Sequence, residues 1–177
     1  MGLLHFFSRS ALCPFSYRET SDREKKSREM FSWLRFVHAT DSELSLIQSA
    51  DESSGGKPGQ LRLDCIEPVS TRNEAAVLAH VGRAARAALA AFDTSLAVDD
   101  AILLANNFPD ANVRNCVVQR RGEKQVLAWW AALAETAIPL LSLPWTELRK
   151  QASKYLSSSA RDHYITHCVA TLVKRGE

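Results

Sequence analysis

The chain has few of the residues that dominate non-globular proteins, with only 7 glycines and 6 prolines among 177 residues. This composition excludes a collagen-like or low-complexity chain. Its 4 cysteines are too few for a disulfide scaffold, and no CxxC pair is present to indicate a zinc ribbon or a thioredoxin-like motif. An excess of charge is also lacking, because 22 basic and 20 acidic residues leave a formal net charge of +2. No strong overall field therefore attracts nucleic acid.

The common catalytic and cofactor motifs are missing as well. Neither GxGxxG nor GxxxxGK[ST] occurs, so the usual nucleotide-binding loops are excluded. The GxSxG turn of the α/β-hydrolases is absent too, and Ser157–Ser159 is a polar stretch rather than an activated nucleophile. We therefore expect a chain that is not an enzyme, with no catalytic residues and no cofactor.

The amino-terminal third differs in pattern from the remainder of the chain. The first 18 residues contain no acid, which is typical of an organelle transit peptide or of a leader upstream of a true start at Met30. The run from Arg18 to Glu29 contains no apolar residue and predicts a solvated connector. We predict a leader or disordered segment at 1–29, a short amphipathic helix at 30–50, and a flexible linker at 51–60. A cytoplasmic location is expected, with a mitochondrial one as the alternative.

Apolar residues with helical spacing fill residues 61–177, which we predict to be one helical domain. The clearest pattern is Leu78, Val81, Ala85 and Leu89 in a helix at about 72–92, entered through capping-box spacing at Thr71 and Glu74. Further helices are predicted at about 96–105, 111–119, 123–138 (closed by Pro139), from 145 on, and from 160 on. The predicted fold class is mainly all-α, a compact bundle of five or six helices.

One short strand or β-ribbon remains an alternative within this bundle. Leu61, Leu63 and Cys65 alternate with polar residues, which indicates an extended segment at 61–66. Its only candidate partner is 116–119 (CVVQ), which also fits a helix.

The one candidate metal cluster is His163, His167 and Cys168. Two histidines four residues apart project from the same side of a helix and can chelate one ion. No Glu follows His163, so the general base of the HExxH metalloproteases is absent. The alternative is two polar residues beside an apolar stripe, with Cys168 filling the core. We expect no bound metal.

A membrane span is not expected, although residues 126–145 carry only one charge, Glu135. An acid at mid-membrane costs about 2.5–3.5 kcal/mol on insertion scales. Two core helices that meet near Pro139 explain the segment better.

The candidate partner-binding residues are Trp129, Arg120, Arg121 and Trp33. Adjacent Trp129 and Trp130 differ by about 100° around a helix, so one core cannot easily bury both. Trp130 shares the inward face, which leaves Trp129 covered by the amino-terminal helix or available to a partner. The sequence thus predicts a non-catalytic protein-protein interaction module, an adaptor or accessory subunit of a larger assembly. The alternative is a nucleic-acid-binding helical domain that uses a basic turn at 119–124 beside the tryptophans.

Overall fold

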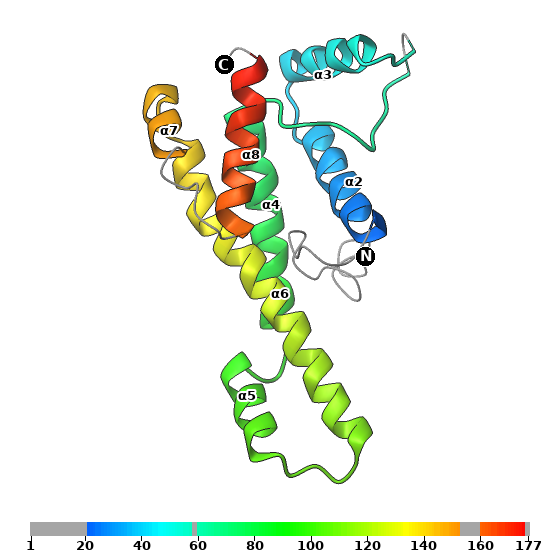
Figure 1. Cartoon of the computed structure of the whole chain (residues 1–177), viewed down its shortest axis with the longest axis vertical. Helices are drawn as coiled ribbons and strands as arrows, with labels where there is room; N and C mark the ends of the chain where they lie inside the picture. Colours follow the sequence, from blue (N-terminus) through cyan, green and yellow to red (C-terminus); the bar gives the residue numbers. More distant parts are fainter. Residues whose placement is uncertain (1–20, 58–59, 153–159, 176–177) are drawn as a thin grey trace.

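The computed structural model describes residues 21–57, 60–152 and 160–175. This part of the chain is helical without a strand, which confirms the all-α prediction. Figure 1 shows its helices. They are α2 (Ser21–Val37), α3 (Asp41–Ser53), α4 (Thr71–Ala90), α5 (Leu96–Ala105), α6 (Ala111–Leu141), α7 (Trp145–Ala152) and α8 (Ala160–Arg175).

The centre of the molecule is the contact between α4 and α6, the most extensive between any two helices. Leu78, Val81 and Ala85 of α4 are fully buried against Leu133 and Ala134 of α6 and their neighbours, as their spacing predicts. Gly82 allows the two helices to approach closely, because a Cβ there would lie 2.6 Å from the Cβ of Ala134. α8 covers the same core with Tyr164, Cys168 and Val169.

Helix α2 belongs to this core, which differs from the sequence prediction. Phe31 and Leu34 are buried with α4, α6 and α8, and the ring of Phe31 lies 5.5 Å from that of Trp130. The helix begins at Ser21, so residues 21–29 of the predicted solvated connector are helical. Glu, Lys and Arg have high helix propensity. They extend a helix that Phe31 and Leu34 anchor, although they bury no apolar surface.

Helix α3 forms a smaller cluster in which Ile47 packs against Ile66 and Val69. It begins with a capping box, since Thr40 accepts a hydrogen bond from the Glu43 amide and the Glu43 carboxylate accepts one from the Thr40 amide. The structure therefore has two helices where one was predicted at 30–50. α3 runs on to Ser53, which makes the first residues of the predicted linker helical.

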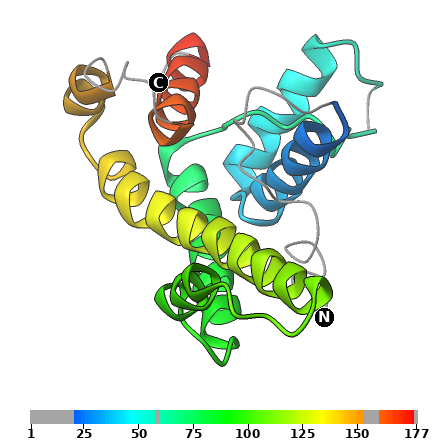
Figure 2. The same ribbon diagram turned by 60° about the horizontal axis from the view of Figure 1, so that its bottom comes forward.

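Helix α6 is continuous over 31 residues, and in Figure 2 it crosses the whole molecule. The predicted turn at 119–124 is therefore wrong. So is the predicted stop at Pro139, because the helix continues to Leu141. Pro139 has no amide hydrogen to donate within the helix, and burial of Leu140 and Leu141 offsets that loss. The predicted ribbon is wrong too, since 116–119 lies within α6 and 61–66 has no strand.

Helix α5 and the first turns of α6 form a hairpin that projects from the remaining helices (Figure 1). α5 spans the predicted residues. Ser95 caps its start, and Asn106 ends it in the left-handed conformation with φ of 48°. Asp110 then caps α6 through hydrogen bonds from the amides of Asn112 and Val113.

Candidate protein-docking surface

Charged side chains join the two helices of the hairpin. Asp99 of α5 is completely buried and accepts a hydrogen bond of 2.7 Å from Lys124 Nζ. It also accepts a bond of 3.0 Å from Arg120 Nε, and Thr94 donates to it. One turn of α6 is thus fastened to α5 by charge-assisted hydrogen bonds, which are about twice as strong as neutral ones.

These contacts keep Asp99 ionised. Burial by itself would raise the pKa of its carboxyl. The hydrogen bonds from Arg120, Lys124 and Thr94 outweigh burial and lower the pKa to about 2. Lys124 is 1% exposed, and its ammonium lies 5.0 Å from the centre of the Phe92 ring. The buried charges are therefore matched.

The same contacts place the cations of the predicted basic turn. Arg120 and Lys124 bind Asp99, and Arg121 binds Asp100. Three cations of the segment 119–124 are thus partnered within the hairpin, which does not favour the nucleic-acid alternative.

With its acids engaged by α6, helix α5 exposes apolar residues. Asp99 is its only buried residue. Val98 is 44% exposed, Ile102 36% and Leu104 87%. This is the reverse of an ordinary amphipathic helix, whose apolar face meets the core.

A second buried ion pair joins α2 to α4. The guanidinium of Arg35 donates two hydrogen bonds of 2.8 Å to the carboxylate of Glu74, and its third nitrogen donates to the carbonyl of Ile66. Tyr164 and Cys168 of α8 also donate to Glu74. The predicted capping box at Thr71 and Glu74 is therefore wrong, because Ser70 caps α4 and Glu74 binds Arg35.

Ionisation of this network follows from its contacts. Burial alone would raise the pKa of Glu74, but the charge and hydrogen bonds of Arg35 hold it below its usual value. Burial raises the pKa of Tyr164 and of Cys168. Both therefore remain protonated donors at neutral pH.

Trp33 is held at the surface by its buried neighbours on α2. Ser32 donates to the carbonyl of Ile66, Leu34 lies in the core, and Arg35 is bound to Glu74. Trp33 itself is 48% exposed. Val37, one turn further along the same helix, is 47% exposed.

Trp129 lies elsewhere than Trp33. It is half-buried against the core, and its ring meets that of Trp130 edge-on at 4.7 Å. Trp130 is 1% exposed, as predicted. The structure therefore does not gather the predicted partner-binding residues into one surface, because Trp33 lies on α2 and the arginines lie in the hairpin.

Two histidines meet just past the end of α2, where His38 directly follows Val37. Nε2 of His38 lies 3.1 Å from Nδ1 of His80 on α4. Burial is the main reason why the pKa of His38 is lowered, with His80, Arg83 and Arg72 adding to the effect. Arg72 also donates to the carbonyl of His38 and to Glu43. Burial alone would raise the pKa of Glu43, but hydrogen bonds from Arg72, Ser70 and Thr40 lower it to about 2.

The candidate metal ligands have separate partners. His167 is exposed and pairs with Glu67 at 3.4 Å, whereas Cys168 is buried on Glu74. The side chain of His163 is outside the described residues. No group of three potential ligands gathers within the part of the chain that the structure describes.

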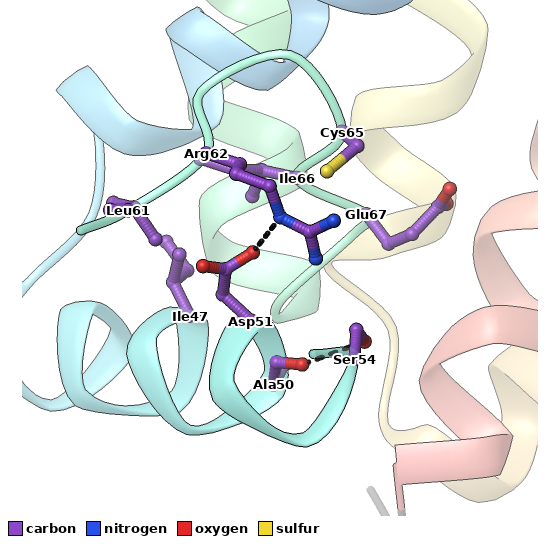
Figure 3. A pocket seen from close by; sticks show the side chains of 9 residues that line it. All are labelled: Ile47, Ala50, Asp51, Ser54, Leu61, Arg62, Cys65, Ile66 and Glu67. Carbon is purple, nitrogen blue, oxygen red and sulfur yellow. Dashed lines mark hydrogen bonds and ion pairs between the residues drawn. The ribbon is translucent and has the colours of Figure 1, made fainter. Parts of the chain in front are cut away.

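A shallow pocket lies between α3 and residues 61–67 (Figure 3). The ion pair between Arg62 and Asp51 crosses it at 2.7 Å, with Cys65 at its rim. Its volume of about 80 Å³ is small beside the roughly 300–1,000 Å³ of ligand sites. It therefore suits water or a small ion rather than a cofactor.

Among the helices of the described residues, none combines the length and apolarity that crossing a membrane requires.

Sequence reasoning missed the outward face of α5 and the Arg35–Glu74 pair. A signal for the first was present, because Asp99 and Asp100 match Arg120, Arg121 and Lys124 at helical spacing. Pairing of these acids with the bases of α6 places the apolar residues of α5 on the opposite, outer side of the helix. The second pair joins residues 39 positions apart and left no local signal.

Comparison with known proteins identifies a family. Residues 8–127, about two thirds of the chain, match the family model described as Rubisco LSMT substrate-binding. No curated protein and no solved structure matches the chain significantly. The match includes α2 to α5 and the first half of α6. It thus covers exposed Trp33 on α2 and the exposed apolar residues of α5. The chain belongs to the Rubisco LSMT substrate-binding family.

Proposed function

We propose that the chain is a non-catalytic module that holds a protein substrate for a methyltransferase, with Trp33 as the anchor of the contact. The single observation that carries this proposal is the setting of Trp33, an exposed aromatic ring on a backbone fixed by buried neighbours. An aromatic side chain on a fixed backbone has few rotatable bonds left to order on binding. Such residues are enriched among the hot spots of interfaces.

The family match supports the kind of partner. Its description names the binding of a substrate by a Rubisco methyltransferase rather than the transfer reaction itself. We therefore propose Rubisco as the bound protein and the methyltransferase as the rest of the assembly. In that role the chain is an accessory part, and the methyl transfer takes place elsewhere.

The surroundings of Trp33 suit a protein interface. Val37 extends its apolar area along α2. His38 directly follows Val37, and its imidazole, which lies 3.1 Å from that of His80, adds a polar group next to this area. An apolar centre with a polar rim is the usual anatomy of such contacts.

The test is binding of the purified full chain to immobilised Rubisco holoenzyme. We expect saturable binding that Trp33→Ala weakens by about 30-fold, the loss that a hot spot of about 2 kcal/mol gives. Leu46→Ala is the matched control, because Leu46 is also exposed, at 54%, but lies on α3. It should change affinity by less than about twofold. Far-UV circular dichroism verifies that both variants are folded.

Two results would overturn the proposal. Absence of saturable binding excludes Rubisco as the substrate, and equal affinities of the Trp33 and Leu46 variants exclude Trp33 as the anchor. Incubation of the chain with a methyl donor and Rubisco tests the non-catalytic part. We expect no methyl transfer.

A further inference from the structure

The contact between His38 and His80 joins the end of α2 to α4. Nε2 of His38 lies 3.1 Å from Nδ1 of His80, and the ring centres are 5.2 Å apart. The distance between the two nitrogens is that of a hydrogen bond. One imidazole must then donate its N–H while the other accepts through a bare nitrogen, so at least one of the two is neutral.

Two arginines of α4 flank this contact. Arg72 donates to the carbonyl of His38. Arg83 follows His80 by three residues and therefore lies on the same side of the helix. In the part of the chain that the structure describes, the charges that act on His38 are all positive. Protonation of both imidazoles would thus place two further cations beside the arginines.

The neighbouring acid does not offset these charges. Glu43 of α3 is bound to Arg72, Ser70 and Thr40, so its carboxylate is already engaged. The last carbonyls of a helix attract cations, but Arg72 already donates to that of His38.

The histidine pair holds the chain where α2 ends. The amide of His38 donates to the carbonyl of Leu34 at 3.0 Å, and the amide of Ala39 donates to that of Phe36 at 3.2 Å. Exposed Val37 directly precedes His38. Release of the pair would therefore loosen these two hydrogen bonds and the position of Val37.

We propose that the His38–His80 contact is a pH-sensitive latch, which holds the end of α2 on α4 at neutral pH and opens in acid. In acid both imidazoles carry a proton, neither can accept the hydrogen bond, and they repel each other. Opening ends at the buried pair of Arg35 and Glu74, so the body of the molecule stays folded. A divalent cation suits the contact less well than a proton, because arginines flank it and no three potential ligands gather within the described chain.

The direction of the pH effect follows from the surroundings of His38. Burial, His80 and the two arginines lower the pKa of His38 below its ordinary value of 6.5. The unfolded chain therefore takes up this proton more readily, and the closed latch loses stability as pH falls below 6.5.

Amide hydrogen exchange of the full chain, followed by NMR and corrected for intrinsic rates, measures the latch. Between about pH 7.5 and pH 5, protection of the His38 and Ala39 amides should fall about tenfold or more. The amide of Ser142 is the internal reference, because it closes the end of α6 on the carbonyl of Ile138. Its protection should change by less than about twofold.

Two variants assign the effect to the pair. His80→Asn puts an amide group near the position of Nδ1, and this group can hydrogen-bond His38 in either protonation state. The His38 and Ala39 amides of this variant should keep their protection at pH 5. His167→Asn is the matched control, because His167 is an exposed histidine of α8 that pairs with Glu67. This variant should lose protection as the wild-type chain does.

Unchanged protection of the wild-type chain in acid overturns the proposal, as does an equal loss in the wild-type chain and in His80→Asn. The consequence for docking rests on the proposed function and is measured separately. Because Val37 adjoins the latch, the affinity for immobilised Rubisco should fall with pH in the wild-type chain more than in His80→Asn. Absence of Rubisco binding at neutral pH would contradict the proposed function alone, since the exchange experiment contains no Rubisco.

Discussion

The body of the molecule and the α5–α6 hairpin use a buried carboxylate in different ways. In the body, Glu74 of α4 is buried against α2 and α8, and the apolar faces of these three helices pack around it. In the hairpin, Asp99 is the only buried residue of α5. In the body the ion pair therefore orients helices that an apolar core already holds together. In the hairpin the ion pair holds α5 in place of such a core.

The two helices that expose apolar residues, α2 and α5, are therefore held in place by different interactions. α2 contributes Phe31 and Leu34 to the core and can expose Trp33 because the other side of the helix is firmly packed. α5 contributes little apolar burial and exposes most of its apolar residues. Its position therefore depends on charge, and we expect it to respond to mutation and pH before the body does.

The largest effect is expected for Glu74→Gln. The substitution leaves Arg35, which is 5% exposed, without a countercharge. Breaking a buried pair from one side costs about 3–5 kcal/mol of unfolding free energy. Urea unfolding followed by circular dichroism measures it. Glu135→Gln removes the exposed partner of Arg86 and should cost less than about 1 kcal/mol. Equal losses for the two variants would contradict the central role of Glu74.

Asp99→Asn should act locally. Loss of a carboxylate that binds charged donors lowers the free energy of opening α5 by about 2–3 kcal/mol. Hydrogen exchange should show faster amides in α5 and little change in α4. Asp100→Asn is the control, because the side chain of Asp100 is 53% exposed. Equal acceleration in α4 and α5 would show that the hairpin and the body open together, against the comparison above.

Lowering the pH should also weaken the protection of the α5 amides in the wild-type chain. Asp99 has a pKa of about 2 in the fold, below its ordinary value of 3.8. A depressed carboxyl pKa stabilises the fold above the ordinary value, and the contribution is lost as pH falls toward the folded pKa. Amides of α5 should therefore lose protection between about pH 5 and pH 2. The Asp99→Asn variant should lack this pH-dependent loss of protection. If its pH profile equals that of the wild-type chain, another group causes the loss.

The sequence predicted those elements whose signals are local. The helix predicted at about 96–105 has the same bounds in the structure, and the spacing of Leu78 and Val81 marks the core face of α4. Each depends on residues within one or two turns, which a sequence displays directly.

The elements that sequence reasoning missed depend on distant partners. Gly122 lies in the turn that the sequence predicts at 119–124, yet contacts of Arg120 and Lys124 with α5 keep α6 helical through it. Glu74 was interpreted as a capping residue because its partner Arg35 lies on another helix. Neither outcome was decided by local propensity, because tertiary contacts overrode it.

The smallest changes in stability are expected for alanine substitutions at two glycines, one in the body and one in the part of α6 that belongs to the hairpin. In Gly82→Ala the new Cβ would lie 2.6 Å from Ala134, so α4 and α6 must separate. Overpacking of this kind costs about 1–3 kcal/mol, although alanine favours the helix. Gly122→Ala meets nothing within 4 Å. It should stabilise α6 by about 0.5–1 kcal/mol through helix propensity alone. Opposite shifts in the urea midpoint would show that close packing governs the body at Gly82 and that α6 has free space at Gly122. Stabilisation by both substitutions would mean that α4 and α6 lie further apart than the structure has them.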